Sequence, residues 1–177
     1  MLGRPIRWRA DRIESFVADI HARHHRVQAK MGLDTDGRIL AFEIDDLVGG
    51  GPFSAYPRTS IVEGNQVLNI AGGPYQVGGF RGKTTVVFQN KTPISQYRAV
   101  GHPMGIVACD SLLEKAAGEM KIDRLEIRRR NFIPDNSYPA SSPGGVPLHD
   151  LSHQACLNKL EQIIDLDELK REQREAK

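Results

Sequence analysis

The stretch RVQAKMGLDTDGRILAFEIDDLV, residues 26–48, decides the fold. In residues 26–33, apolar and polar side chains alternate, a period of two that is typical of a β-strand with one buried face. Asp-Thr-Asp-Gly at residues 34–37 is a strong turn signal, and residues 38–48 contain a second apolar run. The sequence therefore predicts an antiparallel hairpin. The buried side of its first strand would consist of Val27, Ala29, Met31 and Leu33.

One more strand is expected downstream of the hairpin. Residues 84–90 form a short run rich in β-branched side chains, which favours a strand. A short helix is plausible at residues 59–63. Gly78–Phe80 is predicted to be a turn, because the Lys-Ser/Thr ending of a phosphate-binding loop is missing. Before the hairpin, residues 5–20 indicate a short strand followed by a turn or a short helix.

Two helices are predicted after this strand. Residues 104–120 place apolar side chains at helical spacing, and Pro103 stands in the first turn, where proline is tolerated. Cys109 lies among these apolar residues and is expected to be a small buried hydrophobe. Asp123 is expected to cap the next helix, with Glu126 as its capping-box partner.

The C-terminal quarter is predicted to be a loop at residues 134–147 and a helix at residues 148–164. Charged residues dominate residues 165–177, which we expect to be frayed or disordered in isolation. We therefore divide the chain into residues 1–135 and residues 136–177, the latter a linker with a helical, partly disordered tail. Together the elements define an α+β fold, in which the antiparallel hairpin belongs to a short mixed sheet with helices packed on one side.

Composition excludes several classes of protein. A chain of 177 residues fits one domain or a small two-part domain, and a net charge of +2 is too small to indicate nucleic-acid or membrane binding. Cys109 and Cys156 are isolated, which argues against a disulfide framework or a zinc site. No apolar run reaches the roughly 18 residues of a membrane span, and the N-terminus lacks the apolar core of a secretory signal. We expect a cytoplasmic protein.

The candidate functional segment is KTPISQYRAVGHPM, residues 91–104, a polar loop interrupted by proline just before the predicted helix. An arginine, Arg98, together with free backbone N–H groups at a helix entrance, suits a phosphate or another oxyanion. Gly101 would let the backbone approach a ligand closely. The residues alone thus indicate an anion site.

A wider pattern surrounds this loop. The segment at residues 122–131, IDRLEIRRRN, has the form ID-x-x-E-x-R-x-x-N, and GRPIRW at residues 3–8 and GPY at residues 73–75 precede the loop. Over roughly residues 2–170, this succession resembles the molybdopterin-binding large subunit of the xanthine dehydrogenase, aldehyde oxidase and carbon monoxide dehydrogenase family.

The resemblance implies that the loop contacts molybdopterin. Arg98 would contact the phosphates or the pterin edge, close to the backbone amides of Ala99, Val100 and Gly101. Tyr97 would wedge the loop against the core or the substrate channel. The residues alone leave a surface arginine and a packed tyrosine with a solvated hydroxyl as alternatives. Many family members carry glycine or a stacking aromatic residue where Val100 stands, so this departure puts aromatic stacking on the substrate in doubt.

The resemblance places two more residues near the substrate channel. His102 stands where the family often has arginine or another polar residue, although a solvated loop histidine is the alternative. Gln66, or its neighbour Asn65, falls near the position of a substrate-orienting arginine in purine-oxidising members. The closest arginine here is Arg58, which argues against a purine substrate.

Two basic clusters have simpler interpretations. In HARHHR, residues 21–26, His24 and His25 would face opposite sides of a strand, and the neighbouring arginines would repel a cation. His21 and His25 would share a face only on a helix, so we favour a solvated strand entry over a metal site. The arginines at residues 128–130 would point in different directions on a helix, which favours a solvated face over a nucleic-acid site.

The resemblance also implies parts that these residues do not supply. The glycine-rich loop at the metal and the glutamate general base would lie elsewhere, so we assign no catalytic or metal-ligating residue here. Iron–sulfur centres and FAD would be on partner chains, and the molybdenum cofactor could carry a nucleotide. We expect a fragment or split subunit of a molybdenum hydroxylase that oxidises an aldehyde or an N-heterocycle with water as the oxygen source.

In isolation such a chain would be inactive, because one wall of a pocket cannot bury the cofactor. The alternative is a non-catalytic assembly subunit that retains the fold. A small basic nucleic-acid binder is the least favoured reading.

Overall fold

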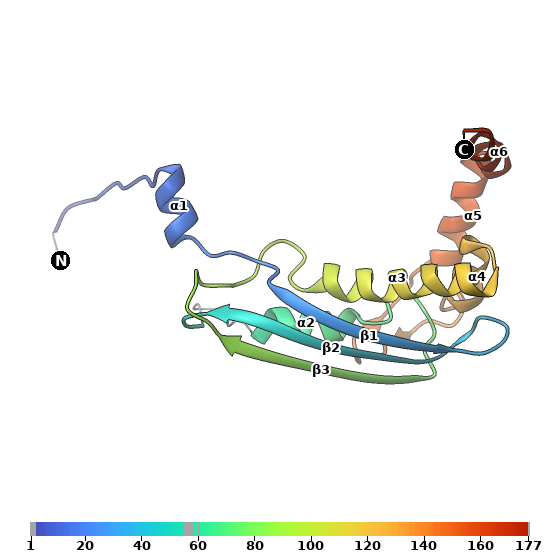
Figure 1. The fold of residues 1–177 in the computed structure, drawn as a ribbon, viewed down its shortest axis with the longest axis horizontal. Coiled ribbons are helices and arrows are strands. Elements are labelled where there is room, and N and C mark those ends of the chain that lie inside the picture. The colour runs from blue at the N-terminus through green and yellow to red at the C-terminus, as the bar shows by residue number, and fades with distance from the viewer. Residues whose placement is uncertain (1–2, 55–58, 60, 177) are drawn as a thin grey trace.

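The computed structural model describes residues 3–54, 59 and 61–176 (Figure 1). Its elements are, in chain order, α1 (Arg12–Ala18), β1 (His25–Leu33), β2 (Ile39–Gly51), α2 (Ile61–Ile70), β3 (Gly79–Phe88), α3 (His102–Met120), α4 (Arg124–Asn131), β4 (Ala140–Ser141), β5 (Pro147–Leu148), α5 (His153–Ile163) and α6 (Leu166–Glu175). They form an elongated body with α1 at one end and α4 to α6 at the other (Figure 1). No helix in these ranges is long and apolar enough to cross a membrane.

The main sheet has the strand order β1-β2-β3. β1 runs antiparallel to β2, with Met31 opposite Phe42, and β2 runs parallel to β3, with Phe42 opposite Phe80. The predicted hairpin is therefore confirmed. The parallel connection through α2 makes the sheet mixed, as the α+β prediction required.

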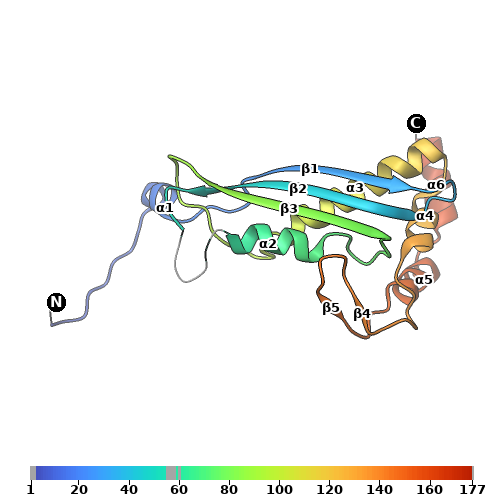
Figure 2. The ribbon, with the colours of Figure 1, turned by 90° about the horizontal axis from the view of Figure 1, so that it is seen from below.

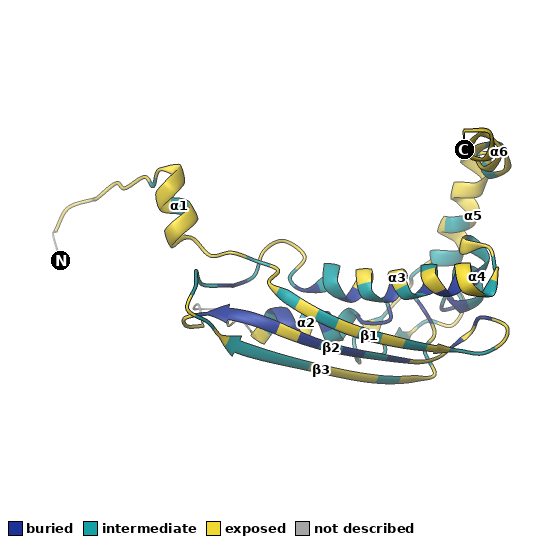
Figure 3. Cartoon of the chain, viewed as in Figure 1, coloured by how far each residue is buried: buried dark blue, intermediate teal, exposed yellow. Residues whose placement is uncertain are grey.

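Helices α2 and α3 cover one face of this sheet (Figures 1 and 2). On β2, Phe42, Ile44 and Val48 are buried while Leu47 is exposed, because alternate residues of a strand point to opposite faces. Figure 3 shows the buried residues along β2 and on the side of α3 that faces the sheet. The core cluster consists of Ile39, Phe42, Ile44, Val67, Ala71, Tyr75, Cys109, Leu113, Ala116, Ala117 and Ile127.

β3 begins earlier than the strand predicted at residues 84–90. A Cβ on Gly78 would lie 2.6 Å from the carbonyl oxygen of Leu40, so glycine allows the chain to run directly beside β2 from this point. Phe80, predicted to lie in a turn, instead pairs with Phe42, and their ring centroids are 6.0 Å apart. The turn prediction was therefore wrong for Gly79 and Phe80, which lie in β3.

α2 extends well beyond the helix predicted at residues 59–63, of which Ser60 lies outside the described residues. Tertiary contacts explain the extension. Val67 is fully buried in the core, and Gly64 lies so close to β3 that a Cβ there would be 2.2 Å from the hydroxyl oxygen of Thr84. Packing against the sheet thus stabilises a segment with weak helical periodicity.

The strand expected at the start of residues 5–20 is absent from the described part of that range. Residues 5–10 have no regular structure, because no described strand pairs with them. The short helix is present as α1, which begins with a reciprocal capping box between Asp11 and Glu14.

The C-terminal part contains more helix and strand than the sequence predicted. The loop predicted at residues 134–147 contains most of the small β4-β5 hairpin, and α5 begins later than the predicted helix. Residues 165–177 were expected to be frayed, yet most of them form α6. Asp165 caps this helix, and Lys170 pairs with Asp123 at 2.9 Å. The division of the chain at residue 135 stays a prediction.

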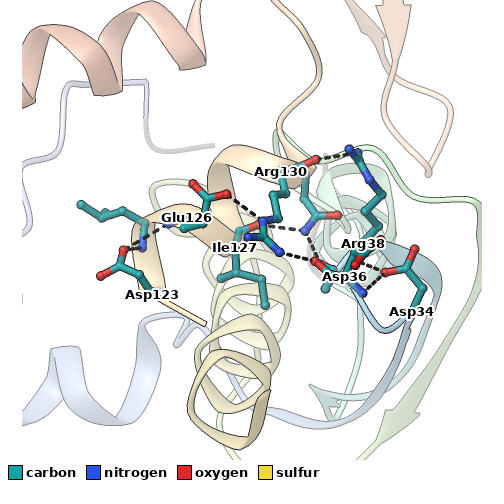
Figure 4. A network of polar contacts seen from close by, with 10 residues as sticks. Asp34, Asp36, Arg38, Asp123, Glu126, Ile127 and Arg130 are labelled. Atoms are coloured by element: carbon teal, nitrogen blue, oxygen red, sulfur yellow. Dashed lines mark hydrogen bonds and ion pairs between the residues drawn. The ribbon is translucent and has the colours of Figure 1, made fainter. Parts of the chain in front are cut away.

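Asn131, the last residue of the ID-x-x-E-x-R-x-x-N segment, links α4 to the hairpin turn. Its neighbour Arg130 reaches the same turn, where it donates to the carbonyl oxygen of Asp36 (Figure 4). The side-chain nitrogen of Asn131 donates to the carbonyl oxygens of Gly37 at 2.7 Å and Ile127 at 2.8 Å. Its side-chain oxygen accepts from the N–H of Ile39 at 2.8 Å. The side chain is buried and bonded in three directions, so this part of the segment has a structural role in the fold.

The arginines at residues 128–130 do point in different directions, but they are not a solvated face. Each makes ion pairs within the chain: Arg128 with Asp110 and Glu114, Arg129 with Glu161, and Arg130 with Glu126. Asp123 caps α4 as predicted, accepting from two backbone N–H groups. The carboxylate of Glu126 turns to Arg130, so the expected capping box is incomplete.

Candidate functional site

The loop between β3 and α3 is fixed at its base to the segment that leads into β1. Ile94 forms an isolated parallel bridge with His21. The N–H of His21 donates to the carbonyl oxygen of Pro93 at 2.9 Å, and the N–H of Ser95 donates to the carbonyl oxygen of His21 at 2.9 Å. These contacts therefore fix the start of the loop, just before the candidate site residues that begin at Tyr97.

The backbone of the loop is strained where it enters α3. Ala99, Val100 and Gly101 have φ angles of 75°, 31° and 78°, in the region that costs a non-glycine residue about 1–2 kcal/mol. The N–H of Val100 donates to the carbonyl oxygen of Tyr97, and the N–H of His102 donates to that of Ala99. The N–H groups of Ala99 and Gly101 donate to no described residue. Such strain is typical of binding and catalytic sites.

Arg23 contacts this loop, and no sequence pattern predicted this contact. Its guanidinium lies 5.3 Å from the centroid of the Tyr97 ring and donates a hydrogen bond to the carbonyl oxygen of Arg98. The interpretation of residues 21–26 as a solvated strand entry holds for Arg23, which is exposed, but it was wrong for His25, whose side chain is only 2% exposed. None of the contacts between described residues engages the guanidinium of Arg98, which is exposed together with Tyr97.

The reason for glycine at position 101 is internal packing. A Cβ there would lie 2.1 Å from the carbonyl oxygen of Glu63 and 3.0 Å from the backbone nitrogen of Val67. A Cβ on Gly105, one turn later, would lie 2.8 Å from the carbonyl oxygen of Val67. The two glycines thus allow α3 to cross close to α2. Ligand approach at Gly101, the reason expected from the sequence, stays a prediction.

The structure brings together the two residues that were predicted separately for the substrate channel. Nε2 of His102 lies 3.0 Å from the side-chain oxygen of Gln66, so the first residue of α3 is bonded to α2. Both side chains are partly buried next to Gly101. Their role in a substrate channel stays a prediction, and Arg58 lies outside the described residues.

A buried ionisable cluster lies beneath the loop. Nδ1 of His25 on β1 is 2.9 Å from a carboxylate oxygen of Asp46 on β2, and its Nε2 is 3.7 Å from a carboxylate oxygen of Glu63 on α2. The three side chains are exposed by only 2%, 0% and 1%. Burial alone would lower the pKa of His25, but the carboxylates of Asp46 and Glu63 outweigh it and raise the pKa to about 9. His25 is therefore charged at neutral pH.

The sequence contained a signal for part of this cluster. Asp46 stands at a position of β2 where the period of two points inward, between the buried residues Ile44 and Val48. A charged residue on the apolar side of a strand requires a buried partner. His25 precedes the inward-facing residues of β1 by the same period, so the pair could have been inferred. Glu63 could not, because only tertiary packing brings α2 to this point.

His24 lies on a different side from His25, as predicted for neighbours on a strand. A Cβ on Gly49 would lie 2.3 Å from Nδ1 of His24, whereas His25 turns inward to Asp46. Within residues 3–54, 59 and 61–176, no group of three or more histidine, cysteine, aspartate or glutamate side chains is arranged to hold a metal ion.

The loop is suited to an anionic ligand. The loop carries Arg98 and is contacted by Arg23. The N–H groups of Ala99 and Gly101, which donate to no described residue, lie at the N-terminal end of the 19-residue helix α3. The positive end of a helix dipole and a guanidinium both favour a phosphate. These features agree with the family resemblance, because molybdopterin carries a phosphate.

Comparison with known proteins shows the family directly. The chain belongs to the molybdopterin cofactor-binding domain family, which it matches over residues 1–132. It is 30% identical over 177 residues to the nicotine 6-hydroxylase large subunit of Paenarthrobacter nicotinovorans, covering 99% of this chain and 21% of that protein. It is 32% identical over 154 residues to subunit gamma of the 6-hydroxypseudooxynicotine dehydrogenase complex of the same organism, covering 86% of this chain and 19% of that protein.

The fold is similar to that of a solved enzyme. Quinoline 2-oxidoreductase from Pseudomonas putida 86 matches with a TM-score of 0.92 and 32% identity, over 99% of this chain and 22% of that chain. The chain thus spans about a fifth of the length of these relatives.

Proposed function

We propose that this chain forms one wall of the cofactor pocket of a molybdenum hydroxylase, and that further polypeptide segments complete the pocket. The observation that carries the proposal is the strained turn Tyr97–Gly101 at the start of α3, which carries the exposed Arg98 and is contacted by Arg23. When bound, the cofactor supplies the redox chemistry for hydroxylating an aldehyde or an N-heterocycle with water as the oxygen source. The relatives named for nicotine and quinoline support the N-heterocycle.

Each residue of the loop has a distinct part in this proposal. The guanidinium of Arg98 and the N–H groups of Ala99 and Gly101, which donate to no group in the described part of the chain, bind the anionic part of the cofactor. Arg23 holds the carbonyl oxygen of Arg98 and covers the ring of Tyr97, which keeps the turn in place when the pocket is empty. Val100 keeps the turn compact without supplying an aromatic stacking surface, and His102 with Gln66 borders the substrate channel.

Exposed apolar side chains support the need for further polypeptide. The segment before β1 extends away from the body (Figures 1 and 2). Its large apolar side chains are between 52% and 74% exposed, and such a series of exposed apolar residues marks an interaction surface: Ile6, Trp8, Ile13, Phe16, Val17 and Ile20. We propose that the rest of a large subunit covers this segment, and that iron–sulfur and FAD subunits complete the assembly.

The test is molybdenum retention in the assembled protein. The chain is co-purified with its companions from the native source, and the molybdenum content is measured by mass spectrometry for the wild type, Arg98→Ala and Arg26→Ala. Arg26 is an exposed arginine on the outer face of β1 and serves as the matched control. We expect Arg98→Ala to lose most of the molybdenum, at least tenfold, and Arg26→Ala to keep it.

Two results would contradict the proposal. Full molybdenum content in Arg98→Ala would show that the turn is not a cofactor contact. A wild-type assembly without molybdenum would favour the second candidate, a non-catalytic assembly subunit. The observation in favour of that candidate is that packing against α2 alone accounts for Gly101.

A further inference from the structure

The buried cluster of His25, Asp46 and Glu63 joins three elements beneath the loop. His25 comes from β1, Asp46 from β2 and Glu63 from the first turn of α2. With His25 protonated, one positive charge faces two carboxylates. With His25 neutral, the carboxylates of Asp46 and Glu63 would be buried with no cation beside them among the described groups that act on His25. Burial of carboxylates without a cation is strongly unfavourable.

The two carboxylates are held very differently. Both oxygens of Asp46 lie within 3.0 Å of Nδ1 of His25. The oxygens of Glu63 have no hydrogen-bond partner among the described residues, and neither has Nε2 of His25, 3.7 Å away. The interaction between Glu63 and His25 is therefore electrostatic, and the attraction exists only while His25 is protonated.

Glu63 also contacts the loop directly, through its backbone. Its carbonyl oxygen is so close to Gly101 that a Cβ there would lie 2.1 Å away. The bond between His102 and Gln66 holds α3 to α2 on the same side. A displacement of the first turn of α2 would therefore move the backbone of the strained turn.

We propose that His25 is a positioning residue for the turn Tyr97–Gly101, and that it acts by holding Glu63, and with it the first turn of α2, against the sheet. The functional consequence rests on the proposed function, since the turn is the proposed cofactor contact. The charged groups that act on His25 are Asp46 from β2 and Glu63 from α2. The carboxylates of Asp46 and Glu63 favour the imidazolium form of His25. When His25 loses its proton, the attraction for Glu63 is lost, and the turn is expected to loosen.

The first test is hydrogen exchange followed by mass spectrometry on the full chain, with exchange rates corrected for the intrinsic effect of pH. His25→Gln removes the charge, and His24→Gln is the matched control at the adjacent, exposed histidine. At pH 7.5 we expect His25→Gln to raise the exchange rates of residues 61–67 and 97–105 at least tenfold, with little change in α4. We expect His24→Gln to resemble the wild type.

The pH dependence separates positioning from a merely structural role. In the wild type, exchange of residues 97–105 should rise as the pH increases through the titration of His25, and in His25→Gln it should not respond to pH. Unchanged exchange in His25→Gln, or a rise of equal size in α4 and the loop, would overturn the proposal.

A second variant covers the case in which His25→Gln does not fold. Glu63→Gln keeps the shape of the side chain but removes the charge that His25 attracts. We expect a tenfold faster exchange of residues 97–105 and a lower pKa of His25 by nuclear magnetic resonance. Normal loop exchange in Glu63→Gln would refute the proposal.

Neither readout uses molybdenum, so the two proposals fail separately. Faster loop exchange in an assembly that holds no molybdenum would support positioning and refute the cofactor contact. Unchanged loop exchange in His25→Gln, together with molybdenum loss in Arg98→Ala, would refute the positioning role of His25 and support the cofactor contact.

Discussion

Two buried polar centres of this molecule differ in how they satisfy their polar groups. At one end of the sheet, Asn131 is a neutral amide whose oxygen and nitrogen bond to three backbone groups. At the other end, His25 is an ion between two carboxylates, and Glu63 has buried oxygens without a hydrogen bond among the described residues. The first centre is independent of pH, whereas the second depends on one proton.

A similar difference separates a structural segment from the proposed cofactor contact. Asn131 ends the segment at residues 122–131, whose charged side chains are occupied by ion pairs and caps within the chain. The turn Tyr97–Gly101 instead has strained backbone, two N–H groups that donate to no described residue, and an exposed arginine. A match to a family motif, such as the segment at residues 122–131, therefore does not by itself indicate contact with a ligand. Unsatisfied and strained groups are the better indicator.

The largest expected effect is at the satisfied centre. Asn131→Ala would leave the N–H of Ile39 and the carbonyl oxygen of Gly37 buried without this partner, so the free energy of unfolding should fall by about 3 kcal/mol or more. Urea denaturation of the chain measures it. Asn65→Ala, at an exposed position of α2, should change stability by less than about 0.5 kcal/mol. Equal losses of unfolding free energy in Asn131→Ala and Asn65→Ala would show that the buried hydrogen bonds of Asn131 do not stabilise the fold.

The next effect is the pH dependence of the second centre. The pKa of His25 is about 9 in the folded chain and 6.5 in the unfolded chain, so the folded state binds the proton more tightly. Its contribution to stability is fully present below pH 6.5 and is lost as the pH rises through 9. Urea denaturation at a series of pH values should show a loss of up to about 3 kcal/mol over this window.

The same series with two variants tests the assignment. His25→Gln should flatten the slope between pH 6.5 and 9, whereas His24→Gln should retain it. A slope that survives in His25→Gln would assign the pH dependence to another group.

The smallest effect is the strain of the turn. Ala99 has a φ of 75°, which glycine adopts freely, so Ala99→Gly should stabilise the chain by about 1 kcal/mol. Ala108→Gly, inside α3, should destabilise it by about 1 kcal/mol, because glycine is unfavourable within a helix. Thermal unfolding of both variants measures the difference. Destabilisation in both would mean that Ala99 is not strained.

Local patterns predicted much of the fold and less of the site. The hairpin followed from period-two alternation and the Asp-Thr-Asp-Gly turn, and α3 followed from helical spacing, because both patterns report which side of an element is buried. The second half of α2 and the start of β3 were missed, since their support comes from contacts with the sheet. Among site residues, Arg98 was proposed from its position before a helix, whereas Arg23 was not, because its partner lies 75 residues away.

The sequence by itself determined the α+β class, the mixed sheet with helices on one side and, through its motifs, the molybdopterin-binding family. These depend on the periodicity and order of neighbouring residues. Only the tertiary structure decided that Glu63 meets His25, that Arg23 meets the turn, and that Gly101 makes room for α2. The physical reason is that each of these contacts joins elements far apart in the chain, whose relative positions are fixed only when α2 and α3 pack together on the sheet.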